Sequence, residues 1–249
     1  MKILDYGSVE LVEAWGSDEN IIRAARQSTD GAFRGWETKC RDCGGSGQVK
    51  CQYPAYCDRC RGTGFLEGDS KLLKYLYTHR HMTPFEMCGA IFEIKAPIFV
   101  FREWHRHRTQ SYNEMSARYI PLPDENYIPS LERIQQTDTK NKQAQGSKEV
   151  SDFDAHDFQL RLKTAYEDAE YQYQHALKAG IPKELARLVV PVGRYSKMWA
   201  SANLRNWMQF LELRNAPNAQ WEIQEYARAV QSLLKETFPR TIELFEEER

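Results

Sequence analysis

The chain has 249 residues, of which 41% are hydrophobic and 28% charged, and its formal net charge is −1 at pH 7. This length suits one full hydrophobic core, so we expect a single main domain over residues 1–249 with smaller additions. The balanced charge gives no reason to expect a general nucleic-acid partner, and no run of about 18 apolar residues is present to span a membrane. The opening residues lack the apolar region of a signal peptide, so we expect a cytoplasmic protein.

The N-terminal part predicts a short strand followed by a helix that ends near Ser28. The composition then changes abruptly, because residues 31–69 contain eight of the 14 glycines and five of the six cysteines. A helix or sheet of the main fold would not tolerate so many glycines. We therefore interpret residues 31–69 as an inserted module, after which residues 71–79 continue as an amphipathic helix.

The inserted module contains two copies of the pattern Cys-x-x-Cys-x-Gly-x-Gly, which is similar to one zinc centre of the DnaJ-type chaperones. Two residues between thiolates allow both sulfurs to face one tetrahedral ion, so two such knuckles predict a closed, structural zinc site. Its ligands would be Cys40, Cys43, Cys57 and Cys60. A disulfide or a redox pair is the alternative, and Cys51 has no partner in this scheme. The partner of the module, protein or nucleic acid, stays open.

Residues 106–119, with the sequence RHRTQSYNEMSARY, bring several cations together with hydroxyl and amide side chains. Arginine presents a planar fork of donors that matches phosphate oxygens, so Arg106, Arg108 and Arg118 predict a site for a polyanion. Glu114 is either their counter-ion or an acceptor for a ligand N–H or O–H group. The alternative is a salt-bridged surface segment. The apolar run at residues 96–101 argues against it, because it predicts a buried strand that leads into the cluster.

The C-terminal half is predicted to be mainly helical. Residues 133–151 have few apolar side chains and predict a mobile loop. Apolar residues then recur at helical spacing between Phe158 and Ala176, and again between Ile223 and Leu234. These patterns predict an α+β chain.

Residues 106–119 resemble the signature of the flavin-dependent thymidylate synthases. Three further segments resemble the same family in the same order: residues 79–86 (HRHMTPFE), residues 97–104 (PIFVFREW), and the stretch from Asn203 to Ile223. The resemblance implies the fold of that family, an antiparallel sheet core with long helices, to which this chain adds the zinc-binding insertion. It also implies a homotetramer with shared active sites.

The same resemblance implies an enzyme that methylates C5 of dUMP to dTMP. Methylenetetrahydrofolate would be the carbon donor, FAD the redox cofactor and NADPH the reductant. No cysteine nucleophile is needed, and Cys88 lies in an apolar run where a small buried hydrophobe is expected. The alternative is a zinc-knuckle protein that binds nucleotide or nucleic acid on the same fold without turnover. A flavin spectrum of the purified protein would distinguish the two.

Matching positions imply the site residues. The implied FAD contacts are Ser28, Thr83, Arg106, His107, Arg108, Glu114, Asn203, Arg205 and Gln209. The implied dUMP contacts are Glu103, Arg106, Glu114, Ser116, Arg118, Arg187 and Arg214. Arg214 is the implied catalytic residue, because a cation beside the uracil ring would promote ionisation of N3.

Several of these positions carry an alternative or depart from the family. Arg205 and Arg214 could instead be surface residues paired with Glu212 or Glu222. Three departures concern Glu103, Gln209 and Asn218, which stand where the family commonly has Gln, Asn and His.

Overall fold

The structure is a computed structural model that describes residues 1–49, 55–136 and 149–248. It divides into two compact units. Unit 1 comprises Met1–Glu13, Ala90–Ala202 and Asn206–Leu233, and unit 2 comprises Ala14–Gly89, Asn203–Arg205 and Leu234–Arg249. Within the described ranges, no helix combines the length and the apolar character needed to cross a membrane.

Unit 1 is organised around a five-stranded sheet in the order β1-β2-β7-β9-β8. The strands are β1 (Lys2–Ile3), β2 (Gly7–Trp15), β7 (Gly89–Pro97), β8 (Ser111–Glu114) and β9 (Tyr195–Asn203). The pairs β1–β2 and β8–β9 are antiparallel, and Glu114 lies opposite Met198. Phe92, Ile94 and Ala96 of β7 are fully buried, because alternate side chains of a strand point to one face.

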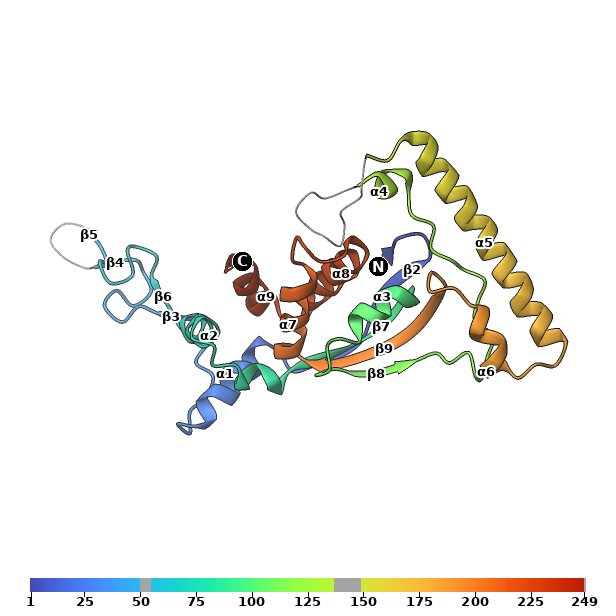
Figure 1. Cartoon of the computed structure of the whole chain (residues 1–249). Coiled ribbons are helices and arrows are strands. Elements are labelled where there is room, and N and C mark those ends of the chain that lie inside the picture. The colour runs from blue at the N-terminus through green and yellow to red at the C-terminus, as the bar shows by residue number, and fades with distance from the viewer. Residues whose placement is uncertain (50–54, 137–148, 249) are drawn as a thin grey trace. The chain divides into compact units, whose positions relative to one another are not determined.

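The helices of unit 1 complete its core. They are α3 (Ile98–Trp104), α4 (Leu131–Gln135), α5 (Asp152–Lys178), α6 (Lys183–Ala186), η2 (Arg187–Val189), α7 (Leu204–Arg214) and α8 (Trp221–Thr237). Helices α3, α7 and α8 lie together over the sheet (Figure 1). The Trp104 ring stacks on Phe210 at 4.5 Å between centroids, and Phe92 meets Trp207 edge-on at 4.9 Å. These aromatic contacts join α3, α7 and β7 into one apolar layer.

The prediction of a strand over residues 96–101 is wrong beyond Pro97. Strand β7 ends there, and α3 begins at Ile98. Val100, Phe101 and Trp104 are buried at helical spacing. A continuous apolar run does not distinguish a buried strand from a buried helix, which explains the error.

The long helix predicted after the loop is confirmed as α5, which has 27 residues. Gly180 follows it with φ of +78°, the left-handed conformation that commonly ends helices. Residues 133–135 of the predicted mobile loop belong to α4, and its residues 137–148 lie outside the described residues. The predicted apolar stripe of α8 is also confirmed, because Ile223, Tyr226 and Val230 are fully buried.

Unit 2 contains short helices and the cysteine module. Its elements are α1 (Asp18–Gln27), β3 (Glu37–Lys39), β4 (Gln48–Val49), β5 (Ala55–Tyr56), β6 (Phe65–Glu67), α2 (Asp69–Thr78), η1 (Thr83–Met87) and α9 (Pro239–Glu247). Strand β3 pairs antiparallel with β6, and β4 with β5. Asp18 accepts hydrogen bonds from Thr241 Oγ1 at 2.6 Å and from the Arg240 N–H at 2.9 Å, which fixes the start of α9 on α1. Burial raises the pKa of Asp18, and these hydrogen bonds oppose the rise.

Candidate active site

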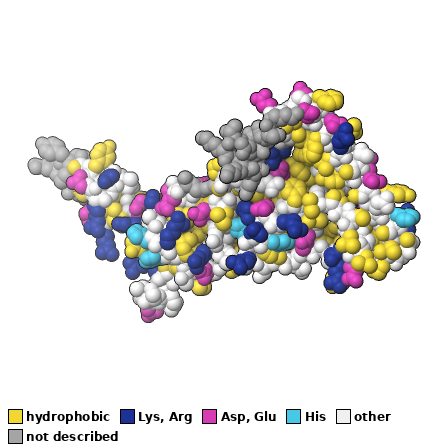
Figure 2. Space-filling view, viewed as in Figure 1, with side chains coloured by type: hydrophobic (Ala, Val, Ile, Leu, Met, Phe, Trp, Pro, Cys, Tyr) yellow, Lys and Arg dark blue, Asp and Glu magenta, His cyan; other side chains and the backbone are white. Residues whose placement is uncertain are grey.

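The turn between α3 and β8 presents two exposed arginines, Arg106 and Arg108. Among the described residues, neither arginine forms an ion pair. The turn is fixed from inside, because the Tyr112 hydroxyl donates to the carbonyl oxygens of Trp104 at 3.0 Å and His107 at 2.7 Å. Lys and Arg side chains lie beside His and acidic ones over α3 and α7 (Figure 2). Two uncompensated guanidinium groups on a rigid turn are suited to bind phosphate oxygens.

The sequence analysis missed Tyr112 and Gln110. The Trp104 indole N–H donates to Gln110 Oε1 at 3.0 Å, and Gln110 Nε2 is buried with no partner among the described residues. Both residues lie within the 106–119 segment, but they are uncharged. Their hydrogen bonds to α3 cannot be read from residue type alone, although both support the position of the arginines.

Arg214, the last residue of α7, is held by three hydrogen bonds. Its Nε donates to His107 Nε2 at 2.8 Å, its Nη1 to Glu103 Oε2 at 2.9 Å, and its Nη2 to the Glu103 carbonyl oxygen at 2.8 Å. The Arg214 side chain is 15% exposed. The alternative that pairs Arg214 with Glu212 or Glu222 is therefore wrong. The Glu222 carboxylate instead accepts from Arg133 at 2.8 Å.

His107 is a buried neutral acceptor. It is 8% exposed, and its ring meets Phe210 edge-on at 4.9 Å between centroids. Burial and the charge of Arg214 lower the pKa of His107 to about 4. Because Nε2 accepts the Arg214 hydrogen bond, the ring proton of the neutral form is assigned to Nδ1. The arrangement thus aims an uncharged imidazole at a guanidinium ion.

Helix α7 also contacts the arginine-bearing turn, since Asn206 Nδ2 donates to the Thr109 carbonyl oxygen at 3.4 Å. Gln209 lies between Asn206 and Arg214 on this helix and is exposed.

The segment from Ser116 to Tyr119 lies against α6. Arg118 pairs with Glu184 at 3.2 Å, with both side chains about half exposed, and Lys183 Nζ donates to the Tyr119 carbonyl oxygen at 2.8 Å. The Arg118 N–H also donates to Ser116 Oγ at 3.3 Å. Arg187 follows α6 directly and is exposed, as is Glu114 at the end of β8. The sequence analysis did not identify Glu184 as the partner of Arg118.

Unit 2 carries the other candidate residues. Arg205 forms an ion pair with Glu86 of η1, so its proposed alternative partners, Glu212 and Glu222, are wrong. Glu86 stands in the 79–86 segment but was not assigned a role there. Thr83 is exposed at the start of η1, and Asn203 is half-buried at the end of β9. Ser28 caps α1, where its hydroxyl donates to the Ala25 carbonyl oxygen at 3.1 Å.

The four predicted ligand cysteines of unit 2 lie together. Their sulfur atoms all lie within 4.8 Å of one another, with Cys40 and Cys57 at 3.7 Å and Cys43 and Cys60 at 3.6 Å. With a zinc–sulfur distance of about 2.3 Å, the sulfurs of a tetrahedral site lie roughly 3.8 Å apart. The observed spacing therefore fits one zinc ion bound by four thiolates. The disulfide alternative is wrong for these residues, because all four are free thiols.

The two knuckles are related by an approximate internal symmetry. The Cys40 N–H donates to the Gly64 carbonyl oxygen and the Cys57 N–H to the Gly47 carbonyl oxygen, both at 2.9 Å. Burial disfavours an ionised thiol at Cys43, but N–H groups of Gly45 and Gly47 outweigh it and lower its pKa to about 7. Cys51 lies outside the described residues. Cys88 is fully buried beside Ser17, which confirms its prediction as a small core residue.

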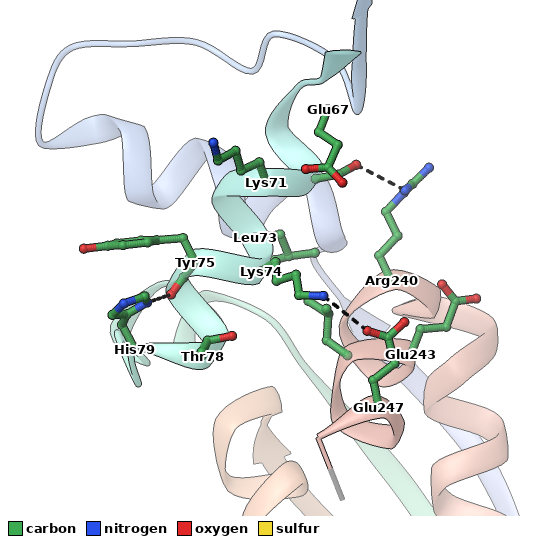
Figure 3. A pocket seen from close by; sticks show the side chains of 12 residues that line it. Glu67, Lys71, Leu73, Lys74, Tyr75, Thr78, His79, Arg240, Glu243 and Glu247 are labelled. Atoms are coloured by element: carbon green, nitrogen blue, oxygen red, sulfur yellow. Dashed lines mark hydrogen bonds and ion pairs between the residues drawn. The ribbon is translucent and has the colours of Figure 1, made fainter. Parts of the chain in front are cut away.

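A cavity of about 520 Å³ lies between α2 and α9 in unit 2 (Figure 3). The cations at its walls face carboxylates: Lys74 pairs with Glu247 at 3.6 Å, and Glu243 lies nearby. The ring of His79 stacks on Tyr75 at 4.1 Å. Because positive and negative groups balance, this cavity shows no preference for an anion.

Known proteins with similar sequences match nearly the whole chain. The family model described as thymidylate synthase complementing protein matches residues 10–240. The chain is 37% identical to the flavin-dependent thymidylate synthase of Thermus thermophilus over 98% of this chain and 77% of that protein. It is 35% identical to the enzyme of the same name from Thermotoga neapolitana, over 98% of this chain and 92% of that protein.

Solved structures of UMP/dUMP methylases are also similar to this chain. The UMP/dUMP methylase PolB from Streptomyces cacaoi, bound with 5-Br dUMP, superposes with a TM-score of 0.76 at 32% identity, over 99% of this chain and 97% of that one. Its complex with 5-Br UMP gives a TM-score of 0.75 at 30% identity, over 99% and 96%. These neighbours share the α+β fold predicted for the chain. The chain therefore belongs to the family of the flavin-dependent thymidylate synthases.

Proposed function

We propose that the protein methylates dUMP at C5 to form dTMP. Methylenetetrahydrofolate would donate the carbon, FAD would act as redox cofactor, and NADPH would act as reductant. The observation that carries the proposal is the guanidinium of Arg214, which is held against neutral His107 and Glu103 in a member of this family. A cation fixed before the substrate arrives can stabilise charge that develops on a uracil ring without reorganising during the reaction.

The proposed binding of FAD is supported by Arg106 and Arg108, whose exposed side chains have no ion-pair partner among the described residues. The diphosphate of FAD carries negative charge, which two such guanidinium groups can pair with. The resemblance adds further contacts, which are Ser28, Thr83, Glu114, Asn203, Arg205 and Gln209. When bound, FAD supplies the redox chemistry, and the protein supplies anion binding and orientation.

For dUMP, we assign the phosphate to Ser116, Arg118 and Arg187, and the uracil N3 to Arg214. Arg118 is paired with Glu184, but an exposed ion pair is worth less than about 1 kcal/mol, so a phosphate can replace that carboxylate. The resemblance also assigns nucleotide contacts to Glu103, Arg106 and Glu114.

The proposed chemistry does not require a cysteine nucleophile. Burial raises the pKa of the Cys88 thiol, which disfavours its reactive thiolate. The other described cysteines belong to the four-sulfur cluster. No cysteine among the described residues is therefore suited to attack a uracil ring.

We also propose that Cys40, Cys43, Cys57 and Cys60 bind one zinc ion with a structural role. Four protein ligands complete a tetrahedral site and leave no position for substrate. The spacing of the sulfurs supports this assignment.

A homotetramer with shared active sites is a further part of the proposal. Apolar side chains gather around α6 and the end of α5 (Figure 2). Leu188 is 78% exposed, Val192 55% and Leu185 53%. Contiguous exposed apolar side chains mark subunit interfaces. Light scattering on the protein as it elutes from a size-exclusion column would measure its mass and so test the proposed tetramer.

We also propose a cytoplasmic location, with which the free thiols of the described cysteines agree.

The test of the function is release of tritium from C5-tritiated dUMP in the presence of FAD, NADPH and methylenetetrahydrofolate, with dTMP identified by chromatography. We expect release that depends on all three additions. A yellow protein that binds dUMP without releasing tritium would favour a binding protein. A colourless protein that binds nucleic acid would favour the zinc-knuckle alternative.

A further inference from the structure

We propose that Glu103 and His107 are positioning residues that act on dUMP through Arg214, in place of the direct nucleotide and flavin contacts that the resemblance implies for them. The inference rests on the proposed function, because it concerns the residue assigned to the uracil ring. The positioning role explains how the Arg214 guanidinium can be oriented before dUMP binds.

The contacts of Arg214 leave a defined part of its guanidinium available. An arginine side chain has five N–H groups, and three of them are used here: one on Nε, one on Nη1 and one on Nη2. One N–H therefore remains on each terminal nitrogen. We call these three contacts of Arg214 with Glu103 and His107 the clamp. The Arg214 side chain is 15% exposed, so the clamp holds a nearly buried cation with two donors still free to meet a ligand.

His107 is fixed by contacts within unit 1. Its Nε2 is occupied by Arg214, its carbonyl oxygen accepts from Tyr112, and its ring packs on Phe210. A histidine that bound the flavin would need a nitrogen directed at it. Here Nε2 is directed at Arg214 and only 8% of the residue is exposed, so a flavin contact could come only from the Nδ1–H group.

Glu103 supplies two acceptors, a carboxylate oxygen and its own carbonyl oxygen, to neighbouring nitrogens of one guanidinium. Two parallel contacts restrict the rotation of the guanidinium plane, which a single contact would not do. The family commonly has Gln at this position. An amide oxygen could make the same contact with Nη1, so the position needs an acceptor and the charge is specific to this chain.

The first experiment compares His107→Gln with His107→Asn in the FAD-loaded protein. The longer amide reaches the place of Nε2 and can accept from Arg214, whereas the shorter amide reaches only the place of Nδ1. We expect His107→Asn to lower kcat by about tenfold or more at unchanged FAD content, and His107→Gln to stay within about threefold of the wild type. The KM for dUMP should change less than kcat, because both free donors of Arg214 remain in place.

Glu103 provides a second test that does not depend on His107. Glu103→Gln keeps an acceptor and should keep kcat within about threefold, whereas Glu103→Ala should lower it by about fivefold or more. Glu93→Gln is the matched control. Glu93 is a carboxylate of the same unit that pairs with Lys197 at 3.5 Å and accepts from Trp199 at 2.9 Å, so its replacement should leave kcat unchanged.

The outcomes separate the positioning role from other roles. Equal losses in His107→Gln and His107→Asn, or loss of FAD together with turnover, would overturn the proposal in favour of a direct flavin contact. Equal losses in Glu103→Gln and Glu103→Ala would show that the charge, and not the contact, is what matters.

A measurement without turnover distinguishes failure of the clamp from failure of the proposed function. In protein labelled with ¹⁵N-arginine, the Nε–H signal that disappears in Arg214→Lys belongs to Arg214. We expect this proton to exchange slowly with water in the wild type and in His107→Gln, and rapidly in His107→Asn. Slow exchange in all three proteins would overturn the clamp. If the wild type forms no dTMP but the exchange rates follow the expected order, the proposed function is wrong and the clamp stands.

Discussion

The lowered pKa of His107 predicts that the protein loses stability in mildly acidic solution through this one side chain. The ordinary histidine pKa of about 6.5 applies to the unfolded chain, and burial and the charge of Arg214 lower it to about 4 in the folded protein. Between these values the unfolded chain binds more protons than the folded one. Stability from this group is therefore fully present above pH 6.5 and is lost as the pH falls toward 4.

The size of the effect follows from the two pKa values. Between pH 7.5 and pH 5, linkage gives a loss of about 2 kcal/mol in the free energy of unfolding from His107 alone. The full loss, reached below pH 4, is about 3 kcal/mol, since each unit of pKa difference corresponds to about 1.4 kcal/mol. A change of this size is a large fraction of the stability of an ordinary domain.

The assay is urea unfolding at both pH values, at one protein concentration, for the wild type and His107→Gln. The variant keeps a possible acceptor for Arg214 but has no group that titrates in this range. The wild type should lose about 2 kcal/mol more than the variant on acidification, because all other titrating groups are shared. Equal losses in the two proteins would refute the reasoning, since they would show that His107 titrates alike in the folded and unfolded states.

Three further predictions concern the proposed site and the cysteine cluster. Arg214→Ala should keep FAD but lose about 2–4 kcal/mol of transition-state stabilisation, read from kcat/KM, and near-wild-type turnover would remove its catalytic role. Arg118→Ala should raise the KM for dUMP with other substrates saturating, and an unchanged KM would contradict its assignment to the phosphate. Replacing Cys40 and Cys43 by Ser should abolish binding of one zinc per chain while FAD remains bound, as metal analysis and a flavin spectrum of the same sample would show. Loss of FAD from a folded double variant would instead make the module part of the active site.

Local patterns allowed much of the fold to be predicted. The apolar stripe of α8 depends only on residue spacing, and Ile223, Tyr226 and Val230 are fully buried as that spacing predicts. The cysteine cluster was predictable for the same reason, because two knuckles with two residues between thiolates bring their sulfurs together without any other part of the chain. Helix α3 was mispredicted because its apolar run continues directly from β7, and hydrophobicity without periodicity does not separate the two.

The contacts inside the candidate site required the tertiary structure. Glu103 and Arg214 are 111 positions apart, and nothing in either local sequence selects one as the partner of the other. The resemblance identified both residues and assigned each to a ligand. It did not indicate that Glu103 and His107 contact Arg214 directly, because a motif records which residue types recur and not which atoms they meet. The same holds for Arg205, whose partner Glu86 lies 119 positions away.

The stem of the cysteine module explains how unit 2 accommodates such an insertion. The chain leaves and re-enters at adjacent points, because the Gly68 N–H donates to the Trp36 carbonyl oxygen and the Asp69 N–H to that of Gly35, both at 2.9 Å. Fully buried Asp69 then accepts from Arg26 Nε at 3.1 Å and from the Arg34 N–H at 2.6 Å. The two ends of the insertion are already paired. The β3–β6 pairing and these contacts therefore offset the entropy cost of closing the insertion as a loop. The four sulfurs then need to order only the residues beyond that pairing, so the cysteine cluster and the start of α2 can form as separate local structures.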